Sequence, residues 1–314
     1  MSDGDILYEA PRYPPPILSP AEIRHLACHG WLPVTLLEHL SQALEQLQAA
    51  ACGYFAGDNA QKRELYPPSH GTESGFYEVP NEKQYVTLRH TVHDNSCMET
   101  HAREVWRDAT AFLHRILCDL SRAGGYDLDA WNGMLEGSHL MPSEDRDLNN
   151  ITTLLRLFKY EAATGIATEH VDIGLLTLCV ANGPGLQMLD RSVTPHRWRD
   201  AVGPIVLVGD MTRALFRGQV RAGMHRVVGI PDCRNSIIYA LRPCLKGILD
   251  LECWGGEGKV DTAEYFLKIK GTRHNINATH DIREKQKLNQ LRKGQMCLLV
   301  LANRISVTVS CNKH

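Results

Sequence analysis

The segment that decides the fold reads HVDIGLLTL over residues 170–178, and a second histidine, His225, follows further along the chain. His170 and Asp172 are separated by one residue and stand directly before an apolar, β-prone run. Two imidazoles and one carboxylate form the 2-His-1-carboxylate iron site, which leaves coordination positions open for a co-substrate and O₂. The pattern therefore predicts that His170, Asp172 and His225 bind Fe(2+).

A carboxylate-binding pair is expected shortly after His225. Arg234 and Ser236 stand two residues apart in a strand-like run, and alternate residues of a strand project to the same side. A guanidinium binds a carboxylate through two charge-assisted hydrogen bonds, and a hydroxyl adds a third donor. An open iron site beside such a pair is what 2-oxoglutarate-dependent oxygenation requires. The pair therefore predicts 2-oxoglutarate as the co-substrate.

Around these residues the chain resembles the isopenicillin-N-synthase-like family of Fe(II)/2-oxoglutarate-dependent dioxygenases. The similarity runs from about residue 29 to 275 and is closest between 154 and 241. It implies a double-stranded β-helix (jelly-roll) core that takes Fe(2+), 2-oxoglutarate and O2. The matching segments are residues 170–178 (H-x-D-x-G-x-x-T-L in the family), 185–187 (G-L-Q), 208–211 (G-D-x) and 224–228 (the distal H-R-V).

The resemblance also implies roles for residues outside the metal motif. Tyr160 ends a run that falls where the family has a strand with a co-substrate tyrosine, so it is expected to donate a hydrogen bond to 2-oxoglutarate. The family often has a polar residue two positions earlier, where this chain has Phe158. Phe76 and Tyr77 resemble the loop that approaches the substrate and are expected to supply an aromatic wall. Lys159 is either a solvated strand residue or a charge for an anionic substrate.

The activity that the resemblance implies is oxidation of a small-molecule substrate, by hydroxylation, desaturation or ring rearrangement, in secondary metabolite biosynthesis. An iron-dependent oxidase that does not use 2-oxoglutarate stays open, because such family members carry the same Arg-x-Ser pair. Succinate release separates these two readings. A non-catalytic binding protein on this fold is a further alternative, for which loss of a metal ligand would be expected, and all three ligands are present.

Composition excludes several other classes of protein. With 43% hydrophobic and 22% charged residues, the 314-residue chain is an ordinary globular protein. Its net charge of −2 provides no basic surplus for a nucleic-acid partner. No apolar run approaches the roughly 18 residues of a membrane span, and the first residues lack the features of a signal peptide. Ten cysteines without a C-x-x-C motif indicate reduced thiols, no structural zinc and a cytoplasmic location.

The pattern along the chain favours one α+β domain over residues 1–314. A helical part is expected over 1–150, the jelly-roll core with the iron site over 151–250, and helices with an unassigned apolar tail over 251–314. Two helices, over 35–50 and 96–124, each begin with a predicted capping box. Further helices are expected at 262–266 and 280–293. Short strands separated by turn residues are expected at 154–158, 175–180, 186–189, 204–208, 226–230 and 236–241.

A second group of histidines raises the question of a second metal site. His90 and His93 are three residues apart, and His101 falls in the first turns of the predicted second long helix. Surface or capping histidines explain this group more simply than metal ligands do.

Overall fold

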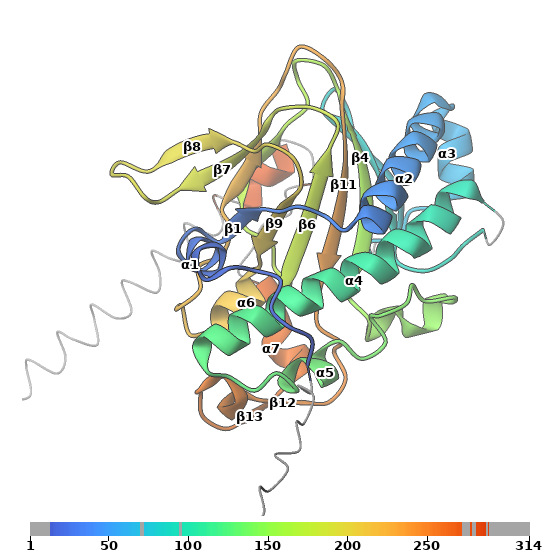
Figure 1. Ribbon diagram of the computed structural model, residues 1–314. Coiled ribbons are helices and arrows are strands. Elements are labelled where there is room, and N and C mark those ends of the chain that lie inside the picture. The colour runs from blue at the N-terminus through green and yellow to red at the C-terminus, as the bar shows by residue number, and fades with distance from the viewer. Residues whose placement is uncertain are drawn as a thin grey trace, which may run out of the picture.

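A computed structural model describes residues 13–69, 72–93, 96–271, 277, 281–286 and 288. In this part of the chain the core is built from a large and a small antiparallel sheet (Figure 1). Along the large, seven-stranded sheet the order is β1 (Trp31–Pro33), β9 (Ile205–Val208), β6 (Leu176–Ala181), β11 (Arg234–Leu241), β4 (Leu154–Tyr160), β3 (Lys83–Leu88) and β2 (Gly75–Val79). The small sheet has the order β5 (Ala167–His170), β10 (His225–Val227), β7 (Leu186–Asp190) and β8 (Arg197–Asp200). This is the α+β jelly-roll architecture predicted from the sequence.

Helices cover one face of the large sheet. The 28-residue helix α4 (Cys97–Gly124) crosses this face, and α2 (Glu38–Ala56) packs beside it (Figure 1). Apolar residues recur along α4 at helical spacing, among them Val105, Trp106 and Leu113, and their side chains are fully buried. The other helices are α1 (Pro20–His29), α3 (Asn59–Leu65), α5 (Ala130–Met134), α6 (Asp210–Leu215) and α7 (Thr262–Lys270). A short hairpin of β12 (Ile248–Asp250) and β13 (Lys259–Asp261) precedes α7.

Strand alternation gives the large sheet two faces of different composition. In β4 and β11, Leu157 lies opposite Ile237 and belongs to the core that packs against the helices. Their chain neighbours Phe158 and Ser236 lie opposite each other on the other face, toward the small sheet. We refer to these as the helix-facing and the pocket-facing sides of the sheet. Because successive side chains alternate, each strand contributes to both.

The predicted strands and most predicted helices are present, but the helix predicted over 35–50, which is α2, begins at a later residue than expected. The capping box expected at residues 35–38 does not form, because α2 begins after Leu37, whose side chain cannot cap. At α4 the box forms only in part. Ser96 accepts from the Glu99 amide at 3.1 Å, while the Glu99 carboxylate accepts from the amides of Val92 and His93. Gly125 ends α4 in the left-handed conformation.

The expected division of the chain at residue 150 is wrong in one respect. The segment 1–150 is not only helical, because it supplies β1, β2 and β3 to the large sheet. Residues 75–83, expected as a substrate loop, instead form most of the β2–β3 hairpin. Residues 281–286 are helical, as predicted for 280–293. The apolar tail from residue 296 lies outside the described residues. None of the described helices has both the length and the apolar character that a membrane span needs.

Candidate active site

Three predicted metal ligands come together at the edge of the pocket between the two sheets. His170 ends β5 and His225 begins β10, and the antiparallel register places them directly opposite each other. Their ring centroids are 4.1 Å apart, and His170 Nε2 lies 3.8 Å from Asp172 Oδ1. One ligand atom from each of the three residues lies within 4.8 Å of the others. The register of β5 and β10 shifts between His225 and Val227, an irregularity of the kind that redirects side chains near functional sites.

Backbone carbonyl groups fix how both imidazoles face this cluster. His170 Nδ1 lies 2.7 Å from the carbonyl oxygen of Thr168, and His225 Nδ1 lies 2.9 Å from that of Gly223. A carbonyl oxygen only accepts, so each Nδ1 carries the hydrogen of this bond, which leaves Nε2 as the ring atom that can bind a metal. This arrangement orients the rings in the manner typical of metal-bound histidines.

The turn after β9 holds the main chain of Asp172 in place. The Asp210 amide donates to the Asp172 carbonyl at 2.7 Å, and the Gly209 amide donates to Leu175 at 2.8 Å. A Cβ on Gly209 would lie 2.0 Å from the Gly174 carbonyl oxygen, so only glycine permits this approach. The Gly-Asp pair is therefore a support for the cluster.

The protonation states of His170 and Asp172 suit the binding of a divalent cation. Burial, and next the imidazole of His225, lower the pKa of His170 to about 3. Burial raises the pKa of the Asp172 carboxyl, but the imidazoles of His225 and His170, with smaller contributions from Thr177 and Arg242, together bring it below its usual value. At neutral pH the cluster then offers a neutral imidazole from His170 and a carboxylate from Asp172, which are the ligand forms that metals bind. The donor set fits Fe(2+).

A pocket lies between the sheets and includes the cluster. The pocket-facing side of the large sheet contributes one wall and the small sheet the other. Along the large sheet the polar lining residues are Arg156, Tyr160, Thr177, Arg234 and Ser236. Sequence reasoning missed Arg156, although it alternates on β4 with Phe158 and Tyr160, which is a signal that it shares their face.

Arg234 and Ser236, the predicted carboxylate-binding pair, both line this pocket. Both side chains are only 1% exposed. Among the described residues, no hydrogen-bond partner is found for the three guanidinium nitrogens of Arg234 or for Ser236 Oγ. Burial raises the pKa of the neighbouring Cys179 to about 11, so this thiol is neutral and provides no counter-charge. A buried cation without a partner carries a large desolvation cost unless an anion binds it.

Tyr160 lies directly opposite Arg234 in the register of β4 and β11. The Arg234 guanidinium carbon is 5.3 Å from the Tyr160 ring centroid. Burial raises the pKa of Tyr160 above its usual value, so its hydroxyl is protonated at neutral pH and can donate. Phe158 stacks on Tyr160 with 5.3 Å between ring centroids. Where the family often has a polar group, this chain therefore has an apolar wall.

The three residues expected near the substrate lie in different environments. Phe76 is not a pocket residue, because it lies in the helix-facing core, where its ring contacts that of Tyr54. Tyr77 packs on the pocket-facing side, stacked on Tyr85 with 5.2 Å between ring centroids. Lys159 Nζ is 3.9 Å from Glu161 Oε1, and its register partner Asn235 contacts Cys52 of α2. Lys159 therefore lies on the opposite side of the strand from Tyr160, and the aromatic wall of the pocket is formed by Phe158 and Tyr160, with Tyr85 packed on Phe158.

The second histidine group does not form a metal cluster among the described residues. His93 Nε2 lies 2.8 Å from the Leu65 carbonyl oxygen, and the His93 amide donates to Glu99. His101 Nδ1 is 3.2 Å from Glu104 Oε2 on the same helix. Two of these three histidines thus have structural partners.

No protein-family model matches the chain. Among curated proteins, the 2-oxoglutarate-dependent dioxygenase frbH of Dothideomycetidae sp. (strain 11243) is 31% identical over 122 residues, which cover 34% of this chain and 37% of the relative. The oxidoreductase vrtI of Penicillium aethiopicum is 27% identical over 150 residues, which cover 45% of this chain and 35% of the relative. The matches thus span about a third of the length of each relative.

Solved structures show the same fold over a larger part of the chain. A 2OG-Fe(II) oxygenase family protein from Caulobacter crescentus superposes with a TM-score of 0.61 at 16% identity, over 79% of this chain and 92% of that protein. A full-length Neurospora crassa protein, in a crystal structure with alpha-KG, superposes with a TM-score of 0.63 at 14% identity, over 81% of this chain and 90% of that protein. The solved structures thus show the fold of the chain, and part of its sequence is similar to a 2-oxoglutarate-dependent dioxygenase and to an oxidoreductase.

Proposed function

We propose that this protein is an Fe(II)/2-oxoglutarate-dependent dioxygenase that oxidises a small-molecule substrate, in the isopenicillin-N-synthase-like branch of the superfamily. One observation carries the proposal. A 2-His-1-carboxylate cluster and a buried guanidinium without a partner line the same pocket. The two imidazoles and the carboxylate of the cluster bind a cation, and an anion would offset the desolvation cost of the buried Arg234 guanidinium. A metal-chelating dicarboxylate such as 2-oxoglutarate satisfies both.

In this proposal His170, Asp172 and His225 hold Fe(2+), which supplies O₂ activation coupled to decarboxylation of the 2-oxo acid. Arg234 binds the far carboxylate of 2-oxoglutarate through two parallel hydrogen bonds, and Ser236 adds a third. Tyr160, protonated and opposite Arg234, donates a further hydrogen bond to the same molecule. The stacked rings of Phe158 and Tyr160 line the pocket beside Arg234 and exclude water there.

A small-molecule substrate is supported by the pocket between the sheets, and a role in secondary metabolism rests on the family resemblance of the sequence. Tyr77 is proposed as an outer part of the aromatic wall, since it stacks on Tyr85. Lys159 and Phe76 are not proposed as substrate contacts, because both lie on the helix-facing side. The absence of a nucleic-acid partner and the cytoplasmic location stay predictions.

The direct test is turnover. Purified protein with Fe(II), 2-oxoglutarate and a panel of small molecules should release succinate together with a mass change in one substrate. Substrate oxidation without succinate would replace this proposal with the oxidase that does not use 2-oxoglutarate. Absence of both products, together with no binding of 2-oxoglutarate, would favour the non-catalytic alternative.

A further inference from the structure

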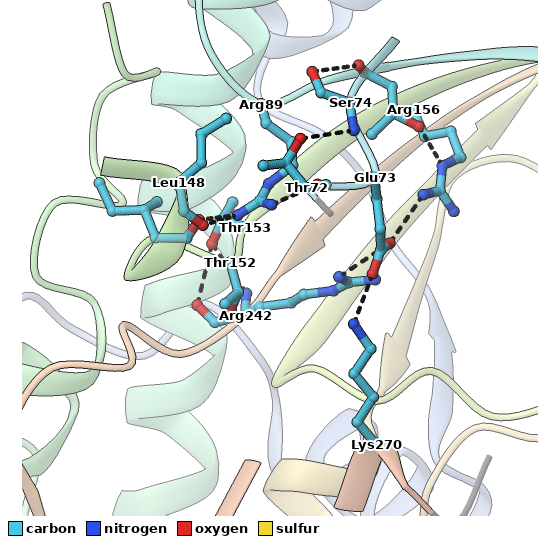
Figure 2. Close-up of polar contacts among 12 residues, drawn as sticks. Thr72, Glu73, Ser74, Arg89, Leu148, Thr152, Thr153, Arg156, Arg242 and Lys270 are labelled. Carbon is cyan, nitrogen blue, oxygen red and sulfur yellow. Dashed lines mark hydrogen bonds and ion pairs between the residues drawn. The ribbon is translucent and has the colours of Figure 1, made fainter. Parts of the chain in front are cut away.

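A cluster of charged side chains borders the pocket at the end away from Arg234. Its centre is Glu73, which lies in the turn before β2 (Figure 2). Glu73 Oε2 is 3.3 Å from Arg156 Nη2 and 3.6 Å from Arg242 Nη1, and Glu73 Oε1 is 3.1 Å from Lys270 Nζ. Strand β4, the residue that follows β11, and helix α7 thus each send one cation to a single carboxylate.

The cluster has a surplus of positive charge. One carboxylate faces three cations, and Arg89, whose amino groups donate to backbone carbonyl oxygens, adds a fourth beside them (Figure 2). Burial raises the pKa of Glu73, but Arg242, Arg156 and Lys270 lower it more, so the carboxylate is ionised. Even so, a single negative charge leaves the cluster positive, and a positive group beside a cavity favours an anionic ligand.

Arg156 is the member of this cluster that lines the pocket. Its Nε donates to Thr87 Oγ1 at 2.7 Å and its Nη2 to Glu73, so neither hydrogen bond uses Nη1. Its guanidinium carbon lies 5.3 Å from the ring centroid of Tyr85 and 6.0 Å from that of Phe158. Two hydrogen bonds and two aromatic faces therefore fix the guanidinium in place, while one amino group stays available. Such preorganisation lowers the entropy lost on binding.

The backbone of Glu73 supports a functional reading of this arrangement. Its φ angle is +64°, in the left-handed region that residues other than glycine seldom adopt. Strain of this kind persists where the surrounding contacts hold a residue in place and often marks a binding site. Here the strained turn brings a carboxylate to Arg156 that β4 itself does not provide.

Arg156 is too far along the sheet from Arg234 to serve the same carboxylate. Arg156 lies opposite Ile238, and Arg234 begins β11 four residues before it. At about 3.3 Å per residue the two positions are roughly 13 Å apart along the sheet. One guanidinium therefore lies at each end of the same pocket face.

We propose that Arg156 binds a carboxylate of the primary substrate, and that Glu73 and Thr87 are positioning residues that hold its guanidinium against the pocket. The substrate class is then a small carboxylic acid with an apolar or aromatic body, which Phe158 and Ile238, the apolar lining residues beside Arg156, accommodate. This inference rests on the proposed function, because it assigns the primary substrate of the same pocket.

The test is a binding comparison between acids and their neutral analogues. The full chain is loaded with Mn(2+) and 2-oxoglutarate, and aromatic and aliphatic carboxylic acids are titrated beside their primary amides, by calorimetry and ligand-observed NMR. At least one acid should bind the wild type at least about tenfold more tightly than its amide, as expected for a charge-assisted hydrogen bond in a buried site. If no acid binds more tightly than its amide, including the case in which none binds, the proposal is overturned.

Variants identify the residue and the source of the carboxylate. Arg156→Gln should remove the preference for the acid, while binding of 2-oxoglutarate stays within about twofold. Thr87→Val keeps every charge and should reduce the preference in part, which covers the case in which Arg156→Gln does not fold. Arg63→Gln is the matched control, since Arg63 pairs with Glu78 at 3.0 Å on the exterior. An undiminished preference in Arg156→Gln, or a loss confined to 2-oxoglutarate binding, would contradict the proposal.

Failure of the proposed function gives a different result. In that case 2-oxoglutarate does not bind the metal-loaded wild type, whereas the preference for acids and its dependence on Arg156 are still measured in samples without 2-oxoglutarate.

Discussion

The two sides of the large sheet differ in how their polar groups are satisfied. On the helix-facing side, Leu157 and Ile237 pack against apolar neighbours, and the Tyr239 hydroxyl is hydrogen-bonded to Thr110. On the pocket-facing side, Arg234 and Ser236 are equally buried and have no hydrogen-bond partner in the part of the chain that the structure describes. The same strands, β4 and β11, build both sides. The helix-facing side thus stabilises the fold. The pocket-facing side keeps an unfavourable desolvation free energy, which the binding of a ligand offsets.

This contrast predicts that substitutions separate into two groups. Those on the helix-facing side should change the free energy of unfolding and leave the affinity for ligands unchanged. Substitutions on the pocket-facing side should change the affinity for ligands and should not lower the free energy of unfolding.

The largest effect is expected at the metal cluster. Substitution of His170, Asp172 or His225 by Ala should reduce succinate release to background and weaken metal binding by at least about tenfold, since even the residues that support metal ligands have effects of this size. The fold should persist, because these side chains lie outside the helix-facing core. Metal content after dialysis and the thermal unfolding midpoint measure the two properties. Full metal content in any of the three variants would refute the assignment.

The largest effect on stability is expected at Leu157. Its side chain is fully buried in the helix-facing core, and Leu→Ala at such a position costs about 2–5 kcal/mol. Denaturant unfolding should show this loss, while the Kd for 2-oxoglutarate, measured where the variant is folded, should not change. A change in Kd as large as the change in stability would show that the two sides are not independent.

Arg234→Lys should have the next largest effect, and on binding alone. Lysine keeps the charge but loses the bidentate geometry, and a lost charge-assisted hydrogen bond costs about 1.5–3 kcal/mol. The KM for 2-oxoglutarate should rise about tenfold or more, and that for the primary substrate should change little. Arg234→Met should leave the ligand-free protein as stable as the wild type or more stable, because it removes an unpaired buried charge. Strong destabilisation by Arg234→Met would indicate a structural role for the guanidinium.

The smallest effects come from two hydroxyl groups on opposite sides of β11. Tyr239→Phe removes the hydrogen bond to Thr110 and should cost about 0.5–1.5 kcal/mol of stability. Ser236→Ala removes a hydroxyl without a partner, so it should leave stability nearly unchanged and raise the KM for 2-oxoglutarate modestly. Paired unfolding and kinetic measurements on both variants test the contrast, which fails if the two show the same profile.

Motifs with a fixed spacing could be located from the sequence, because local geometry determines them. Arg234 and Ser236 share a side through strand alternation, and the strands beside the metal motif were expected from their apolar runs. Contacts between distant segments could not be foreseen. Arg156 depends on Glu73, which a strained turn brings to it from outside the predicted core. Phe76 was misplaced because a resemblance to a loop did not reveal which side of β2 each residue occupies.

The missed helix α1 carried a readable signal. Ser19 and Glu22 form a complete capping box, with Ser19 accepting from the Glu22 amide and the Glu22 carboxylate accepting from that of Ser19. By contrast, β1 contains only three residues and forms through its pairing with β9, a long-range contact that no local pattern encodes.

The account depends most on the claim that one molecule of 2-oxoglutarate bridges the metal cluster and Arg234. Calorimetric titration of 2-oxoglutarate into the Mn(2+)-loaded wild type, His225→Ala and Arg234→Lys proteins tests this claim directly. The account predicts one site in the wild type and at least about tenfold weaker binding in each variant. Equal affinity in all three proteins, or no binding to the metal-loaded wild type, would contradict it.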